Sequence, residues 1–321
     1  MTAQSRKRRT QDRGLILVAA LAIVVSACAG SQEPNPADAG ITIVVSTTIW
    51  GDVARSVVGA DGTVQVLVPL GVDPHDYQAS SSQVADINRA DLVIVNGFGL
   101  EENMTDVFAS AEIDGVLVLN IGPSIEAVTL GGADSGAVCD QGAEVSGCDP
   151  HFWMDPDRAS VAAALIADAL AQIDDSVDWL GRADEYVRSM EEAVDTMENA
   201  LSSVPVERRK LVTNHDSLQY FADRFGFEVI ATVIPGGSTL ADPSSADLAN
   251  LVETMRNEGI NVIFADTTDS TALADAVAAE LGESVTVVEL FTGSVGEPGS
   301  GAETLIGLLT VDAERIAAAL Q

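Results

Sequence analysis

The amino-acid sequence predicts an α/β protein built from two doubly wound, Rossmann-like β/α lobes that a long, rigid helix joins. Short β-branched runs alternate with helical stretches in two separate series along the chain. The apolar residues of these runs are consecutive rather than alternating, which is typical of parallel strands covered on both faces. One long amphipathic segment stands between the two series. We therefore expect two lobes, at 41–177 and 206–321, on either side of a linking helix at 178–205.

The N-terminal segment has the pattern of an export signal. A cluster of basic residues precedes the apolar run 14–27, which is shorter than the roughly 20 residues of a membrane span. The run leads into "VSAC", which resembles a bacterial lipobox and predicts a lipoprotein signal peptide at 1–27, with cleavage before Cys28 and lipid attachment to that cysteine. A plain signal peptide that happens to end near a cysteine is the alternative. The small, polar, proline-bearing residues at 28–40 indicate a flexible tether.

The first lobe should contain four strands, because four β-branched runs end in turn residues. They occupy 41–47, 63–69, 91–97 and 115–122. Helical patterns occupy 50–59, 81–90 and 102–111, and a further helix is expected at about 157–173.

The segment 178–205 should form one helix that runs along both lobes. Apolar residues recur at helical spacing from Trp179 to Leu201, and Pro205 ends the pattern. This Met-bearing and aromatic face indicates packing rather than a cofactor site. Because a helix is stiffer than paired loops, the strut should resist a large hinge opening between the lobes.

The second lobe repeats the strand and helix alternation of the first. Its strands are expected at 210–215, 227–234, 261–266 and 285–291. Its helices are expected near 216–225, 244–258, 271–281 and 302–320.

The charge balance excludes one class of partner. The 321 residues include 16 Lys and Arg against 49 Asp and Glu, which gives a net charge of −33, and five of the basic residues lie in the signal segment. A chain without a basic surface is not a nucleic-acid-binding protein. A cationic ligand fits the sign of the charge, although acidic surfaces also serve solubility.

The three cysteines have two predicted roles. Cys28 is the candidate lipid anchor, and Cys139 and Cys148 enclose a short glycine-bearing loop in a protein bound for an oxidising compartment. These conditions favour a disulfide between Cys139 and Cys148. The alternative is that Cys148 and His151, spaced as C-x-x-H, form a zinc pair.

The three histidines mark the candidate site, because each follows a predicted strand. His75 and His151 both stand in the tripeptide Asp-Pro-His, and His215 ends "KLVTNH". Ligands of open α/β sheets bind beyond the carboxyl ends of the strands, so the three side chains should meet in the cleft between the lobes. Each histidine has a nearby carboxylate of the kind that orients a metal-bound imidazole. These carboxylates are Asp73, Asp76, Asp149 and Asp216. The alternative for a single histidine is an ordinary polar group near the surface.

Seven segments of the chain form a specific set of motifs: "TTIWGDVARSVVG", "VPLGVDPHDYQAS", "ADLVIVNGFGLE", "DPHFWMDPDRA", "NHDSLQYFADRFG", "NVIFAD" and "FTGSVGEPG". Through these motifs, residues 41–320 resemble the solute-binding proteins of zinc and manganese ABC transporters, also called the cluster A-I family. The resemblance implies that His75, His151 and His215 bind one metal ion, and the histidine at the third position implies zinc more than manganese. It also implies a monomer that works with a membrane permease and a cytoplasmic ATPase.

One departure from the family concerns the fourth ligand. The family commonly has Asp or Glu before the serine of the "FTGS" segment, and this chain has Gly293 there. Asp266 is our candidate replacement because it ends a predicted strand that faces the same cleft; a helix N-cap is its alternative role. A water molecule could also complete the site. Three neutral imidazoles and one oxygen ligand suit Zn²⁺.

The remaining choice is between a binding protein and an enzyme. A catalytic zinc site also has three protein ligands and an open position, so coordination alone allows a hydrolase. The sequence has no H-E-x-x-H, no G-x-S-x-G and no glycine-rich phosphate loop. We therefore predict a lipid-anchored, non-enzymatic protein on the extracytoplasmic face of the cell membrane that captures zinc for an importer. A manganese importer component and an adhesin are the alternatives.

Overall fold

The computed structural model describes residues 40–130, 139, 147–282 and 285–321, and Gly40–Gln321 forms one compact unit. The predicted signal peptide and Cys28 lie outside the described residues. Among the residues that the structure describes, no helix has the length and apolar character needed to cross a membrane.

The first lobe is built on a four-stranded parallel sheet with the strand order β2-β1-β3-β4. Its strands are β1 Ile41–Val45, β2 Gly62–Val66, β3 Leu92–Val95 and β4 Val118–Asn120. Its helices are α1 Thr48–Val58, α2 Ser81–Ile87, α3 Thr105–Ile113 and α4 Pro156–Ile173. Short 3₁₀ turns lie at Glu102–Met104, Gly122–Ser124 and Phe152–Met154. The chain reverses its direction of winding between β1 and β3, so the ligand-binding edge of this sheet is at their carboxyl ends.

The second lobe has the same plan, with a parallel sheet in the order β6-β5-β7-β8. Its strands are β5 Lys210–Thr213, β6 Glu228–Thr232, β7 Val262–Asp266 and β8 Thr286–Leu290. A 3₁₀ turn at Val206–Arg208 precedes β5. The helices are α6 Gln219–Phe225, α7 Ser245–Glu258, α8 Ala272–Leu281 and α9 Leu305–Leu320.

Both sheets are covered on both faces, as continuous apolar strands require. Val44 and Val93 of the first sheet pack with Phe108 of α3, and Val212 of the second packs with Met255 of α7. The opposite faces of the two sheets share one core with α1, α4, α5 and α9. The predicted fold class of two β/α lobes is confirmed.

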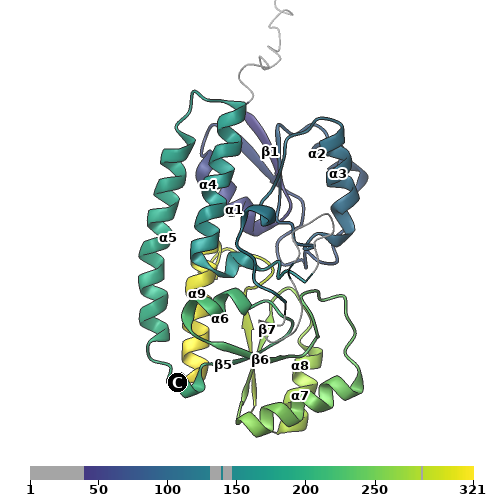
Figure 1. Ribbon diagram of the computed structural model, residues 1–321, viewed down its shortest axis with the longest axis vertical. Helices are drawn as coiled ribbons and strands as arrows, with labels where there is room; N and C mark the ends of the chain where they lie inside the picture. Colours follow the sequence, from purple (N-terminus) through teal and green to yellow (C-terminus); the bar gives the residue numbers. More distant parts are fainter. Residues whose placement is uncertain (1–39, 131–138, 140–146, 283–284) are drawn as a thin grey trace, which may run out of the picture. The chain divides into compact units, whose positions relative to one another are not determined.

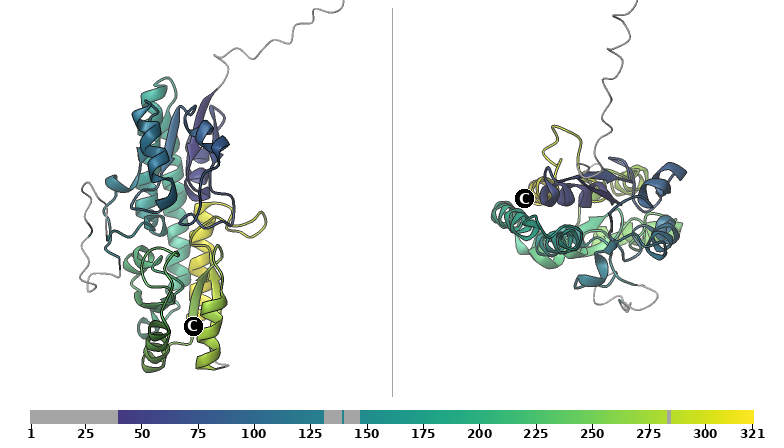
Figure 2. Two further views of the ribbon diagram at one scale, coloured as in Figure 1. Left: turned by 90° about the vertical axis from the view of Figure 1, so that its right-hand side faces the viewer. Right: turned by 90° about the horizontal axis from the view of Figure 1, so that it is seen from above.

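The helix α5, Trp179–Leu201, packs against α1 and α4 of the first lobe and against α9 of the second (Figure 1). The two turned views keep it beside α4 (Figure 2). It ends before the predicted limit of 205, because Ser202–Val204 form a turn ahead of Pro205. A proline disfavours helical geometry in the residue before it and donates no hydrogen bond of its own.

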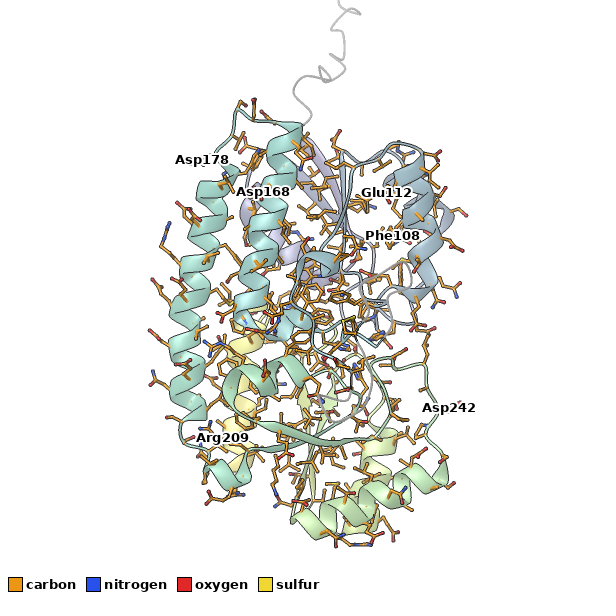
Figure 3. All side chains as sticks on the ribbon, in the orientation of Figure 1. Phe108, Glu112, Asp168, Asp178, Arg209 and Asp242 are labelled. Carbon is orange, nitrogen blue, oxygen red and sulfur yellow. A yellow bond between two sulfur atoms is a disulfide. The ribbon has the colours of Figure 1, made fainter. Side chains whose placement is uncertain are left out.

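Charged side chains lie exposed at the surfaces of the helices. Asp168 of α4 and Asp178 before α5 are exposed (Figure 3). On α3 the buried Phe108 faces the sheet, whereas Glu112, one turn later, is exposed. The buried residues of α3 are Phe108 and Ala111, which lie three residues apart on the side that packs on the sheet.

The predicted helix at 216–225 begins three residues late, at Gln219. The residues between β5 and α6 form a tight turn instead, in which Ser217 N donates to His215 O at 2.9 Å. From this turn, Asp216 N donates at 3.1 Å to Gly236 O, which lies in the segment after β6. This turn determines where the third histidine points.

Candidate metal centre

His75 lies in the loop after β2, and its own motif fixes its backbone. Asp73 Oδ1 accepts a hydrogen bond from His75 N at 2.9 Å, which is the local turn that an Asp two residues earlier can make. Asn103 Nδ2 donates to His75 O at 3.2 Å. The backbone of His75 is therefore held from both sides.

His151 is held by the same kind of turn and by its ring. Asp149 Oδ1 accepts from His151 N at 2.9 Å and contacts His151 Nδ1 at 2.8 Å, so the other ring nitrogen, Nε2, is the one available to a ligand. Neighbouring side chains fix the surrounding backbone: Asn96 Nδ2 donates to Pro150 O at 3.0 Å and Tyr220 OH donates to Asp149 O at 2.8 Å.

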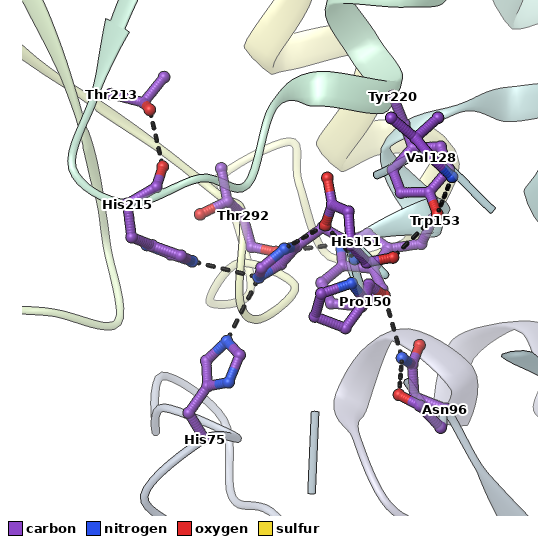
Figure 4. Close-up of polar contacts among 12 residues, drawn as sticks. His75, Asn96, Val128, Pro150, His151, Trp153, Thr213, His215, Tyr220 and Thr292 are labelled. Carbon is purple, nitrogen blue, oxygen red and sulfur yellow. Dashed lines mark hydrogen bonds and ion pairs between the residues drawn. The ribbon is translucent and has the colours of Figure 1, made fainter. Parts of the chain in front are cut away.

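His215 enters from the second lobe, directly after β5. Thr213 Oγ1 donates to His215 O at 2.7 Å (Figure 4). Trp153 Nε1 donates to Thr292 O at 2.9 Å and so joins the His151 segment to the loop after β8. The site is thus assembled across the two lobes.

The three imidazoles converge on one point. His151 Nε2 lies 3.3 Å from His75 Nε2 and 3.1 Å from His215 Nε2 (Figure 4), and one ligand atom of each residue lies within 4.8 Å of the others. Donors around a tetrahedral zinc, with Zn–N distances of about 2.0–2.1 Å, lie roughly 3.3 Å apart. The spacing therefore fits a single metal ion.

Burial keeps these imidazoles neutral. It lowers the pKa of His75 to about 3, with a further lowering by His151, and lowers the pKa of His151 to about 4. The pKa of His215 is also well below its usual value, first through burial and then through the other two histidines. A neutral imidazole keeps a lone pair for a metal, whereas a protonated one does not.

Asp149 is the buried carboxyl group beside His151. Burial raises its pKa to about 8, because a charged carboxylate loses its hydration there. Its hydrogen bonds to His151 fix the ring in one orientation, the role that carboxylates have beside metal-bound histidines.

The structure does not bring Asp266 into the group of three histidines. Among the described residues, the group with ligand atoms close enough to share an ion is His75, His151 and His215. Asp266 ends β7, is buried, and its Oδ1 accepts from Thr268 N at 2.9 Å. It does not cap the next helix, which starts at Ala272 after Thr271. Asp266 thus ends its strand in a local turn.

The backbone of Gly293 nevertheless lies close to the side chain of Asp266. A Cβ atom at position 293 would lie 2.7 Å from Thr268 Oγ1 and 3.0 Å from Asp266 Oδ2. Burial raises the pKa of Asp266, and its charge acts on His151. The glycine therefore leaves room for the carboxyl group of Asp266 beside the site.

Cys139 and Cys148 form a disulfide, with a Cα–Cα distance of 4.4 Å. The sulfur of Cys148 is bonded to Cys139 in this structure, so it is not paired with His151 as a C-x-x-H ligand. Thr129 and Cys148 also form an isolated antiparallel bridge. The disulfide thus links Cys139 to Cys148, which lies three residues before His151.

Sequence reasoning missed the supporting residues of the site. Tyr220, Asn96 and Thr292 come from three separate segments and reach the His151 motif only through the fold. The signal that could have indicated Tyr220 and Trp153 is their chemistry, because a buried Tyr or Trp usually needs a partner for its polar atom.

Comparison with known proteins identifies the family. A family model described as the periplasmic zinc-uptake complex component A, ZnuA, matches residues 43–319. The chain belongs to this family of metal-binding solute-binding proteins. As the sequence predicted, a member is the substrate-binding component of a metal ABC transporter, which works with a permease and an ATPase, and is not an enzyme.

Relatives of this solute-binding protein carry the names of two metals. The manganese-binding lipoprotein MntA of Halalkalibacterium halodurans is 26% identical over 297 residues, which cover 91% of this chain and 93% of the relative. The zinc-binding protein TroA of Treponema pallidum is 28% identical over 301 residues, with 91% and 92% covered. Its solved periplasmic zinc-binding structure matches with a TM-score of 0.75 and 27% identity, over 88% of this chain and 99% of that one.

A manganese-bound structure is similar to about the same degree. The Mn-bound periplasmic metal-binding protein of Candidatus Liberibacter asiaticus matches with a TM-score of 0.74 and 25% identity, over 88% of this chain and 100% of that chain. Similarity therefore assigns a zinc or manganese transporter component and does not choose between the two metals.

Proposed function

We propose that this protein is a lipid-anchored, extracytoplasmic solute-binding protein that captures Zn²⁺ and delivers it to its ABC permease. The observation that carries the proposal is the convergence of three buried Nε2 atoms, with His151 Nε2 3.3 and 3.1 Å from the other two. Three buried Nε2 atoms that face one another cannot all find a hydrogen-bond partner there, and a metal ion would satisfy all three at once.

The donor set supports zinc over manganese. Imidazole nitrogen suits zinc, whereas carboxylate, carbonyl and water oxygens suit manganese. Within the described residues, the group that can share an ion contains three histidines and no carboxylate. Manganese is the second candidate, because relatives such as MntA are named for it.

We infer that Asp266 supplies the fourth ligand, directly or through a water molecule. Its carboxyl group is buried beside Gly293 and acts on His151. A cation in the site would favour the charged carboxylate, against the effect of burial on its pKa. Asp266→Asn should weaken zinc binding, and Gly293→Ala should weaken it by pushing the Asp266 side chain aside.

The cellular setting follows from the N-terminal pattern. Cleavage before Cys28 and lipidation of that residue would place the protein on the extracytoplasmic face, with 28–40 as a tether. The tether would let a monomeric binding protein meet its permease while it remains attached to the membrane. Relatives named as lipoproteins support this proposal.

The experiment is a calorimetric titration of metal-free protein with Zn²⁺ and, separately, Mn²⁺. The wild type should bind one Zn²⁺ per chain, and binding should also raise the thermal stability by mass action. His75→Ala, His151→Ala and His215→Ala should each lower the affinity by orders of magnitude. Gln172→Ala is the matched control, because Gln172 is exposed on α4 and, among the residues that the structure describes, its side chain donates to Asp168 O of the same helix.

Two outcomes would contradict the proposal. Wild-type affinity in all three histidine variants would place the metal elsewhere. Tighter binding of Mn²⁺ than of Zn²⁺ would keep the site and replace the cargo with manganese.

A further inference from the structure

Residues 234–240, which we call the clasp, connect the His215 turn to the first lobe. On the side of the second lobe, Ile234 N donates to Asn214 O at 2.7 Å, and Asp216 N donates to Gly236 O at 3.1 Å. These bonds lie on both sides of His215 in the sequence. The clasp therefore moves together with the backbone that carries the third imidazole.

The same segment reaches across to the first lobe at two places. Thr239 Oγ1 donates a hydrogen bond to Asp73 Oδ2. Gly237 packs so closely on Leu130 that a side chain at this position would collide with it. Leu130 precedes the Cys139–Cys148 loop, so the clasp contacts two separate segments of the first lobe.

Asp73 has a second role that makes the first contact important for the site. Its other carboxylate oxygen, Oδ1, accepts from His75 N at 2.9 Å. One side chain thus joins the backbone of His75 to Thr239 of the opposite lobe. Through the clasp, the segments that carry His75 and His215 are connected by hydrogen bonds.

His75 needs this support more than His151 does. The Nδ1 atom of His151 contacts Asp149, whereas His75 Nδ1 has no hydrogen-bond partner among the described residues. The orientation of His75 therefore depends on its backbone and on Asp73. A metal ion held by three residues from two lobes can leave only when one of these residues moves away.

We propose that Thr239 and Asp73 are positioning residues that hold His75 against the other two imidazoles and slow the release of the metal. This inference rests on the proposed function. The clasp acts on the geometry of the ligands and contributes no ligand itself.

The test compares Thr239→Val with Thr239→Ser and Thr271→Val. Valine keeps the shape of threonine and removes the hydroxyl group, and serine restores it. Thr271 is the matched control, because it also bonds an aspartate side chain, Asp275 Oδ2 at 2.9 Å, but within its own lobe. Zinc release from the loaded full-length protein into excess chromophoric chelator is followed by stopped flow.

Loss of a hydrogen bond to a charged group should speed release on the order of ten-fold in Thr239→Val. Thr239→Ser and Thr271→Val should release zinc at the wild-type rate, and all variants should still bind one Zn²⁺. An unchanged rate in Thr239→Val, or an equal increase in Thr271→Val, overturns the proposal.

A second measurement does not depend on metal. In the metal-free protein, amide hydrogen exchange of residues 236–240 should be faster in Thr239→Val than in the wild type or in Thr271→Val. Equal exchange rates in the wild type, Thr239→Val and Thr271→Val would overturn the proposal that Thr239 holds the clasp to the first lobe. If the wild type shows the expected exchange but binds no zinc, the proposed function fails while the contact between the lobes stands.

Discussion

Replacing Asp149 with Asn tests whether a buried carboxylate prepares His151 for metal binding. Asp149 Oδ1 accepts from His151 N at 2.9 Å and contacts Nδ1 at 2.8 Å, and Asp149 is fully buried. Asparagine has nearly the same shape and keeps one acceptor oxygen. Burial raises the pKa of Asp149 to about 8, so at a pH above that value the substitution removes a negative charge and leaves the space filled.

The magnitude follows from the two hydrogen bonds. A hydrogen bond to a charged group contributes about 1.5–3 kcal/mol and a neutral one about 0.5–1.5 kcal/mol. The hydrogen bond between Asp149 and the ring of His151 strengthens when a cation binds to Nε2. Removing the charge of Asp149 should therefore cost about 1.5 kcal/mol of the free energy of metal binding. That is about a ten-fold loss of zinc affinity, at the lower end of the 10–100-fold range typical of such supporting residues.

The assay is competition for Zn²⁺ against a fluorescent chelator, with Asp155→Asn as the matched control. Asp155 lies four residues after His151 and is also buried, but its side chain accepts from Asp157 N at 2.9 Å, which caps α4, and pairs with Arg158. Asparagine is an equally good N-cap, so this substitution removes the charge of Asp155 beside Arg158, keeps the cap of α4, and should leave the zinc affinity unchanged. An Asp149→Asn affinity within two-fold of the wild type, or an equal loss in Asp155→Asn, would refute the reasoning.

Three further outcomes are expected. Cys28→Ala should move the protein from the membrane fraction to the soluble fraction without unfolding it, and persistent membrane association would contradict lipidation. Thiol counting on denatured protein from an oxidising compartment should find Cys139 and Cys148 both blocked; two free thiols would favour the C-x-x-H pair. Burial raises the pKa of Asp312 to about 8, so the folded state holds a proton that the unfolded chain releases, and stability from this group is lost as the pH rises from about 4 to about 8. The melting temperature of Asp312→Asn relative to the wild type should therefore rise across this window in calorimetry at stepped pH, and a constant difference would show that Asp312 does not titrate there.

The fold could be predicted because its signals are local and repeated. Runs such as Ile41–Val45 and Val262–Asp266 are apolar on both faces, which parallel strands covered by helices require. Helix ends were harder to predict, because they depend on single caps. Thr47, whose side chain accepts from Trp50 N, starts α1 two residues before the predicted helix.

The site could be predicted only in part, because some of its residues are placed by the order of strands and helices and others by a single neighbouring group. The position of a histidine at the end of a strand follows from the order of elements, and the structure places the three rings together. The position of a carboxyl group such as Asp266 depends on which neighbour bonds it, here Thr268 N. No pattern in the sequence shows that Gly293, far along the chain, leaves space for this side chain.

The repeated Asp-Pro-His tripeptide shows where local prediction ends. In both copies the aspartate Oδ1 accepts from the histidine N at 2.9 Å, a turn that the sequence alone specifies because Asp bonds the backbone two residues on. The fold then uses the two aspartates differently. Asp149 turns to the ring of its own histidine, whereas Asp73 accepts from Thr239 of the other lobe. Identical tripeptides therefore give one histidine fixed by its own motif and one fixed across the cleft, and the second should be the easier one to release.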